Sequence, residues 1–148
     1  MKKFKNREKE SDYSIIIGCG RLGASIADNL SEKGRSVMVV DKNSEAFKRL
    51  SFGYGGLTFN GDASEIYVLN EINVEKAKSV VVATNNDNTN ILIAQLIKER
   101  YNVPRVIARL YEPEKACVYE DADIMTLCPA VLSANEIKKL LNIDTVEP

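Results

Sequence analysis

The stretch IIIGCGRLGASIADNL, residues 15–30, decides the fold of this chain. Three glycines, Gly18, Gly20 and Gly23, follow a short apolar run and precede apolar residues at helical spacing. A G-x-G-x-x-G loop between a predicted strand and a predicted helix is the context in which such loops bind nucleotide phosphates. In that arrangement Gly18 permits the tight turn, Gly20 lets the backbone approach the phosphates, and Gly23 lets the helix pack closely on the strand. A glycine-rich turn without a ligand is the alternative.

The composition is typical of a globular domain. The chain has 148 residues, of which 45% are hydrophobic and 28% charged. That length fits one domain whose core needs neither disulfides nor metals. The net charge of -1 gives no bulk attraction to nucleic acid, and the apolar runs are too short for membrane insertion. With three distant cysteines and no histidine, we expect no metal site, no disulfide framework and a reducing cytoplasm.

Short apolar runs alternate with segments of helical spacing along the rest of the chain. We expect strands at residues 13–17, 36–41, 56–62, 79–87, 105–110 and 123–129, the fourth of which runs into a polar loop. Helices are expected at residues 21–33, 43–50, 64–72, 89–101, 113–119 and 130–141. The predicted N-caps are Asn43 or Ser44, Ser64 and Asp87, and Gly34 is the predicted C-cap of the first helix.

This alternation predicts an α/β fold. Most of the strands are apolar throughout, which is typical of strands covered on both faces and therefore of a parallel sheet between helices. Right-handed crossovers then give a doubly wound, Rossmann-like six-stranded parallel sheet with helices on both faces. Residues 1–12 are expected to be a charged, flexible leader, residues 13–142 the domain, and residues 143–148 a tail.

A carboxylate stands where the second strand ends. Asp41 follows Gly23 by 18 residues, where an acid accepts hydrogen bonds from the ribose hydroxyls of a bound nucleotide. Because a carboxylate repels a 2′-phosphate, NAD or an adenine nucleotide is favoured over NADP, although the adjacent Lys42 weakens that preference. The alternative is that Asp41 only caps the next helix.

The third strand ends in a second candidate contact. Asp62 and Ala63 follow it, at the edge of the sheet that surrounds the ligand crevice in this fold. They are predicted to contact the adenine through side chain and backbone. Asp62 is also a candidate cap for the next helix, and the two roles can coexist.

Polar residues follow the fourth and fifth strands at the point where the strand order reverses. Thr84, Asn85 and Asn86 are placed to donate hydrogen bonds to ribose or phosphate. Arg109 ends the fifth strand, where a guanidinium group reaches phosphate oxygens. A salt bridge from Arg109 to Asp87 or Glu112 is the alternative.

No catalytic residue is assigned. Hydride transfer usually needs an acid or base that titrates near neutral pH, and the chain has no histidine. Cys19, inside the glycine loop, fits a small filler better than a nucleophile. We therefore expect that the protein is not an enzyme and that the nucleotide is bound without being transformed. A subunit of an NAD-dependent oxidoreductase is the rival interpretation.

In their order and spacing, the motifs together resemble the nucleotide-binding lobe of RCK/KTN domains (TrkA-N type). These domains regulate potassium channels and Trk/Ktr-type potassium transporters. The resemblance covers roughly residues 13–142. It rests on IIIGCGRLGASIADNL (15–30), VVD (39–41), GDAS (61–64), VVVATNNDNTNILIAQLIKE (80–99), VIARLYEP (106–113) and ADIMTLCP (122–129).

The resemblance implies a ligand and its contacts. The ligand would be NAD or NADH, alternatively ATP or ADP, with AMP as a further option. The implied contacts are the glycine loop, Asp41 at the ribose, Asp62 and Ala63 at the adenine, Thr84 and Asn85 after the fourth strand, and Arg109, which in the family reaches the terminal phosphates across a dimer. The full candidate set adds Lys42 and Asn86, and its loop residues are Gly18, Cys19, Gly20, Arg21, Leu22 and Gly23.

The resemblance also implies an assembly. Family members form homodimers or higher homo-oligomers on a membrane potassium transporter or channel subunit, which places this chain in the cytoplasm at the inner face of the membrane. Residues 130–142 resemble the family's crossover helix, with a stripe of Ala130, Ala134, Ile137 and Leu141 facing the neighbouring subunit. The alternative is that this helix packs on its own sheet. The chain stops just after it, so no C-terminal RCK lobe is expected within it, and such a lobe is either absent or a separate protein.

Overall fold

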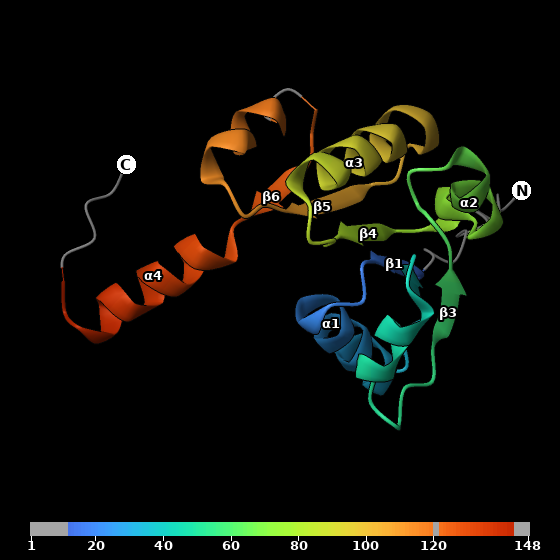
Figure 1. Ribbon diagram of the computed structural model, residues 1–148, viewed down its shortest axis with the longest axis horizontal. Coiled ribbons are helices and arrows are strands. Elements are labelled where there is room, and N and C mark those ends of the chain that lie inside the picture. Colours follow the sequence, from blue (N-terminus) through green and yellow to red (C-terminus); the bar gives the residue numbers. More distant parts are fainter. Residues whose placement is uncertain (1–11, 120–121, 144–148) are drawn as a thin grey trace, which may run out of the picture.

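Figure 1 shows the computed structural model, in which residues 12–119 and 122–143 are described. The predicted leader and tail, residues 1–12 and 143–148, therefore lie outside the described residues except for Asp12 and Ile143.

The elements alternate along the chain as expected. The strands are β1 (Ser14–Ile17), β2 (Val37–Asp41), β3 (Leu57–Asn60), β4 (Ser79–Val82), β5 (Arg105–Arg109) and β6 (Met125–Leu127). The α-helices are α1 (Arg21–Glu32), α2 (Ile66–Glu71), α3 (Asp87–Tyr101) and α4 (Pro129–Leu140). Two of the predicted helices and one connection are 3₁₀ turns instead: η1 (Ser44–Arg49), η3 (Pro113–Tyr119) and η2 (Val74–Lys76).

The six strands form one parallel sheet in the order β3-β2-β1-β4-β5-β6. This order confirms the predicted doubly wound fold. The chain first builds outward from β1 through β2 to β3, and then returns to place β4 on the other side of β1. The carboxyl ends of β1 and β4 therefore diverge into loops of opposite direction, which opens a crevice at that edge.

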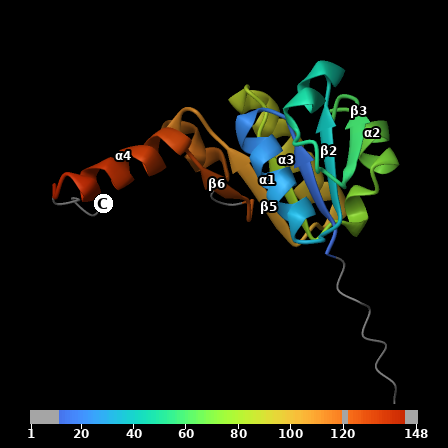
Figure 2. The ribbon, with the colours of Figure 1, turned by 90° about the horizontal axis from the view of Figure 1, so that it is seen from below.

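Helices cover both faces of the sheet, so the sheet has a core on each side (Figures 1 and 2). Alternate residues of β1 divide between them: Ile16 packs with the α1 and η1 side, and Ile15 and Ile17 pack with the α2 and α3 side. All three are at most 3% exposed. Burial of both faces explains why β1 is apolar at every one of these positions.

The helix ends confirm some of the predicted caps and correct others. The side chain of Asn43 accepts a hydrogen bond from the amide of Glu45, as an N-cap does. Lys33, not the predicted Gly34, is the C-cap of α1, and Gly34 follows it with the positive φ of +70° that ends the helix. Ser64 is not the cap of α2, which begins two residues later without a side-chain cap. Asp87 is not the cap of α3 either, because Asn86 takes that position and accepts from the amide of Thr89.

Helix α4 leaves the body of the domain. Figure 2 shows it projecting away from the sheet beyond β6, and none of its residues is buried. The alternative that this helix packs on its own sheet is therefore wrong. Val131, Leu132, Ile137 and Leu140 are between 41% and 75% exposed, which leaves an apolar helix surface without a cover in the single chain.

No helix in the described part of the chain is long and apolar enough to cross a membrane.

Candidate functional site

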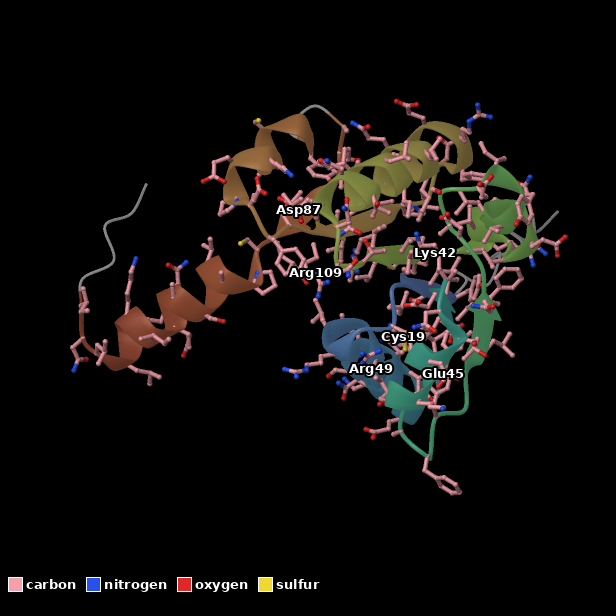
Figure 3. The ribbon with its side chains drawn as sticks, in the orientation of Figure 1. Cys19, Lys42, Glu45, Arg49, Asp87 and Arg109 are labelled. Atoms are coloured by element: carbon pink, nitrogen blue, oxygen red, sulfur yellow. The ribbon has the colours of Figure 1, made fainter. Side chains whose placement is uncertain are left out.

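A cleft of ≈ 460 Å³ lies at the carboxyl ends of β1, β2 and β4. This is the edge that the reversal of strand order opens, and the cleft is hereafter the carboxyl-edge cleft. It is lined by Ile17, Gly18, Cys19, Gly20, Arg21, Val40, Asp41, Lys42, Asn43, Ala46, Arg49, Gly61, Asp62, Ala63, Ala83, Thr84, Asn85, Thr89, Ile93, Arg109 and Tyr111. Figure 3 shows Cys19 and Arg49 on the α1 side of this region, and Asp87 and Arg109 where α3 begins.

The three motif glycines serve different ends. Gly18 has a φ of +100°, and a Cβ there would lie 2.5 Å from the carbonyl oxygen of Ala83. A Cβ on Gly23 would overlap the carbonyl oxygen of Gly18. The fold itself therefore requires glycine at both positions. A Cβ on Gly20 would meet nothing within 4 Å, so the fold does not require glycine at this position.

The first turn of α1 borders the cleft with unpaired amides. Gly20 is the N-cap and has no side chain to accept a hydrogen bond, and the first turn contains no acidic residue. The leading N–H groups of the helix and its positive dipole end are consequently available to an anion. The open space beside Gly20 is where a phosphate would approach them.

Asp41 fixes the glycine loop and still offers acceptor capacity. Its Oδ2 accepts a hydrogen bond from the amide of Cys19 at 2.8 Å, and its Oδ1 accepts from the amide of Asn43 at 2.8 Å. Each carboxylate oxygen has a second lone pair, which a ribose hydroxyl can use. Asp41 therefore combines the predicted place at the end of β2 with a structural role that its position in the sequence did not indicate.

Cys19 acts as a packing residue. Its side chain is buried against the α1 side of the sheet, and burial, followed by the charge of Asp41, raises the pKa of its thiol. A thiol held protonated is a poor nucleophile, so the interpretation as a small packing residue is favoured. Arg49 reaches the same loop from η1, where its Nη1 donates to the carbonyl oxygen of Cys19 at 3.4 Å.

Asp62 closes the turn that leads into α2. Its Oδ1 accepts from the amide of Ser64 at 2.9 Å and from the Ser64 hydroxyl at 2.7 Å, and these bonds hold the pKa of the carboxyl below its usual value. Ala63, beside it, is 3% exposed. Both residues line the cleft, so the turn and the cleft wall are formed by the same residues.

A buried amide joins the ends of β4 and β5. Asn90 of α3 is 0% exposed and accepts from the amide of Thr84 at 3.0 Å. Its Nδ2 donates to the carbonyl oxygens of Thr84 and Arg109 at 3.1 and 3.0 Å. The position of Thr84 on the cleft wall thus depends on Asn90, a residue that sequence reasoning did not single out.

Asp87 and Arg109 have different partners from those expected. The carboxylate of Asp87, 7% exposed, accepts from the amides of Tyr111 and Glu112 at 2.8 and 3.0 Å. Arg109 donates from Nη2 to the carbonyl oxygen of Thr84 at 2.7 Å, and its guanidinium carbon lies 4.9 Å from the centre of the Tyr111 ring. The salt bridge to Asp87 or Glu112 is not found in the described part of the chain.

Most of the expected site residues meet in the carboxyl-edge cleft. Leu22, Gly23 and Asn86 do not line it: Gly23 is packed beneath the loop, and Asn86 caps α3. Sequence reasoning missed the lining residues Ile17, Val40, Asn43, Ala46, Arg49, Gly61, Ala83, Thr89, Ile93 and Tyr111. Position in the turn after β2 was the available signal for Asn43 and Arg49, since that turn borders the same edge of the sheet.

One spacing in the chain bears on the oxidoreductase interpretation. Tyr111 and Lys115 stand in the Tyr-x-x-x-Lys spacing that short-chain reductases use, so the absence of histidine does not by itself leave the chain without a candidate acid–base pair. The structure does not pair them: the Lys115 ammonium lies 3.6 Å from the Glu112 carboxylate, and the Tyr111 ring stacks on Arg109. Lys115 does not line the cleft.

Comparison with known sequences identifies relatives of this chain. Residues 14–128 match the model of the TrkA-N domain family. A Trk system potassium uptake protein TrkA from Streptomyces coelicolor is 32% identical over 136 residues, which cover 92% of this chain and 61% of that protein. The chain thus spans about three fifths of the length of this curated relative.

Solved structures share the fold. The TrkA-N domain of the inner membrane protein ybaL from Escherichia coli superposes with a TM-score of 0.79 at 16% identity, over 88% of this chain and 97% of that one. A structure of GsuK bound to ADP superposes with a TM-score of 0.72 at 26% identity, over 91% of this chain and 35% of that one.

Proposed function

This chain belongs to the TrkA-N domain family, and from that premise we propose that it binds an adenine nucleotide and regulates a membrane potassium transport protein. The observation that carries the proposal is the carboxyl-edge cleft, where the free amides of α1, the open space at Gly20 and the carboxylate of Asp41 converge. Amides and a helix dipole bind phosphates, and a strand-end carboxylate accepts from ribose hydroxyls.

The proposed ligand is NAD(H), ATP, ADP or AMP. Binding of ADP by GsuK, at 26% identity, supports an adenine nucleotide in this cleft. The adenosine would lie against Asp41, Asp62 and Ala63, and the phosphates against the glycine loop. Arg109 already donates one nitrogen to Thr84, while its Nε is buried without a partner in the described part of the chain. That geometry supports a role for Arg109 beside the phosphates rather than in a structural ion pair.

The proposed assembly is a homodimer through α4. The helix projects from the domain with its apolar residues exposed, and a second copy of the chain would bury them. Regulation would then follow from a population shift, since a nucleotide with different affinities for two dimer arrangements changes their ratio. A membrane transporter or channel that contacts the dimer from the cytoplasm would respond to that ratio.

The rival is a subunit of an NAD-dependent oxidoreductase. The curated relative is named a potassium uptake protein, which favours regulation. Tyr111 and Lys115 contact different partners, Arg109 and Glu112, and this also favours a regulatory protein over a reductase. A regulatory protein should leave NADH unchanged on prolonged incubation, whereas an oxidoreductase should consume it with some acceptor.

The test is calorimetric titration with AMP, ADP, ATP, NAD, NADH and NADP, on the full chain and on Gly20→Val. The Cβ that Gly20→Val adds would meet no protein atom within 4 Å and would lie where the phosphate approaches, so the variant should fold and lose binding. Gly53→Val is the matched control, because a Cβ at Gly53 also meets nothing within 4 Å and Gly53 does not line the cleft.

Each outcome of this titration has one meaning. Binding that Gly20→Val abolishes and Gly53→Val retains supports the site. Undiminished binding in a folded Gly20→Val chain would show that the nucleotide binds elsewhere. Absence of binding to all six nucleotides in the unaltered chain would refute the proposed function.

A further inference from the structure

A second hollow lies at the opposite edge of the sheet, where β1, β2 and β3 begin. Its volume is ≈ 660 Å³, against ≈ 460 Å³ for the carboxyl-edge cleft, and the two share no lining residue. We call it the amino-edge hollow. It is lined by Asp12, Tyr13, Ser31, Gly34, Arg35, Ser36, Val37, Met38, Gly55, Gly56, Leu57, Asn73 and Lys76.

Glycines create the space. Gly34, Gly55 and Gly56 line the hollow and contribute no side chain to fill it. A Cβ on Gly34 would meet nothing within 4 Å, and a Cβ on Gly55 would approach only the Ser31 hydroxyl oxygen, at 3.5 Å. At Gly56, in contrast, a Cβ would overlap the Tyr54 hydroxyl, so that residue is glycine for packing reasons.

The wall formed by the loop before β3 is held in place. The Ser31 hydroxyl oxygen of α1 accepts a hydrogen bond from the amide of Gly55 at 2.8 Å. The Tyr54 hydroxyl donates to the carbonyl oxygen of Leu57 at 2.7 Å. These bonds fix the loop at both ends of the wall, so the hollow is largely pre-formed, as small-molecule sites usually are.

The lining combines an apolar floor with unpaired cations. Met38 is half-buried. Leu57 is 63% exposed, which is a large exposed fraction for an aliphatic side chain on a cavity wall. The side chains of Arg35 and Lys76 make no hydrogen bond or ion pair with any residue that the structure describes. Among the lining residues that the structure describes, Asp12 is the one carboxylate, so this part of the lining carries two cations and one anion.

This charge balance selects the ligand class. The carboxyl-terminal end of α1 borders the hollow at Gly34, and its partial negative charge alone would disfavour an anion. Arg35 and Lys76 reverse that preference, and charged groups that lack a protein partner form the strongest hydrogen bonds with an ionised ligand. A ligand with one negative charge and an apolar body matches both parts of the lining.

We propose that the amino-edge hollow binds a small amphipathic carboxylate, whose charged group pairs with Arg35 and Lys76 and whose apolar body packs on Met38 and Leu57. The site is separate from the carboxyl-edge cleft and does not depend on the proposed function. An organic acid could then bind to the domain and influence it whether or not a nucleotide is bound.

The test is calorimetric titration of the full chain with sodium octanoate and with octanamide, which keeps the apolar body and lacks the charge. The variants are Gly55→Phe, which places a ring in the hollow, and the double variant Arg35→Gln/Lys76→Gln. The matched control is Arg100→Gln/Arg105→Gln, because both arginines are exposed and do not line the hollow. Each titration is repeated with saturating ADP.

The proposal expects octanoate to bind more tightly than octanamide. The double variant should weaken octanoate binding about tenfold, with little effect on octanamide. Gly55→Phe should abolish both, and the control should bind normally. Displacement of octanoate by ADP, or octanoate binding that neither Gly55→Phe nor the double variant changes, would overturn the proposal. The second result would place the probe elsewhere, for example on the exposed surface of α4. Failure of octanoate to bind the unaltered chain would refute it as well.

Discussion

Replacement of Asn90 by leucine tests how the structure positions the cleft wall. Asn90 is 0% exposed and its amide bonds Thr84 and Arg109, at the ends of two neighbouring strands. Leucine has the same number and branching of side-chain heavy atoms and is somewhat larger, so Asn90→Leu removes the hydrogen bonds without leaving a cavity. The Thr84 amide and the Arg109 carbonyl oxygen lose the partners that Asn90 provides.

The magnitude follows from the cost of burying an unpaired polar group. Each such group costs about 1–3 kcal/mol, so two cost about 2–6 kcal/mol. Burial of the leucine side chain offsets part of this, because it adds favourable transfer of apolar surface. We therefore expect a net loss of about 2–4 kcal/mol in the free energy of unfolding. For a chain of this size that lowers the Tm by about 5–15 °C.

Urea denaturation followed by circular dichroism measures this loss, and hydrogen exchange locates it. The Thr84 amide should lose its protection in Asn90→Leu. The control is Asn88→Leu on the exposed side of the same helix, which should change stability by less than about 0.5 kcal/mol. A midpoint for Asn90→Leu equal to that of the unaltered chain, with Thr84 still protected, would refute the reasoning that Asn90 holds the strand ends together.

Three further predictions address the loop, the pH range and the assembly. Gly23→Ala should lower stability by about 1–3 kcal/mol in urea, because its Cβ overlaps the Gly18 carbonyl oxygen, whereas Gly20→Ala should be close to neutral. Burial raises the pKa of Tyr13 and of Tyr54 to about 12 from 10.0. The neutral phenols therefore stabilise the folded chain fully below about pH 10, and this contribution is lost as the pH rises through about 12. Absorbance of the phenolate against pH checks this prediction, and ionisation of every tyrosine near pH 10 in the folded chain would contradict it. Leu132→Glu, at a residue 56% exposed on α4, should shift a dimer to monomer in light scattering and leave the unfolding midpoint of the monomer unchanged. Ser25→Glu, on the exposed side of α1, is its control, and a dimer that persists in Leu132→Glu would argue against assembly through α4.

The site residues that sequence reasoning found share a property. Gly18 and Gly20 belong to a local pattern whose spacing reflects a strand, a turn and a helix in immediate succession. Their proximity needs only a few residues of chain. Asp41, Asp62, Thr84 and Arg109 were placed by a fold rule, because the carboxyl ends of parallel strands share one edge.

The residues that sequence reasoning missed or misassigned owe their roles to contacts between segments that are distant in the chain. Asp87 was expected to cap its own helix, but Asn86 caps it, and Asp87 instead accepts from two amides beyond β5. Arg49 reaches the Cys19 carbonyl from a 3₁₀ turn 30 residues further along the chain. Hydrogen-bond partners of this kind are set by how elements pack, and a single sequence has no periodicity that encodes them.

The sequence by itself determined the order of the elements, the parallel sheet and the glycine loop between β1 and α1. These features follow from local requirements of backbone conformation and burial. Apolar strands, helical spacing and glycines at tight turns can therefore be recognised in the sequence. Only the tertiary structure decided which glycine is open to a ligand, how Asn90 joins two strand ends, and that α4 leaves the sheet with its apolar residues exposed. The amino-edge hollow, too, was visible only in the tertiary structure, because a cavity is the space left between segments that are distant in the chain and pack together.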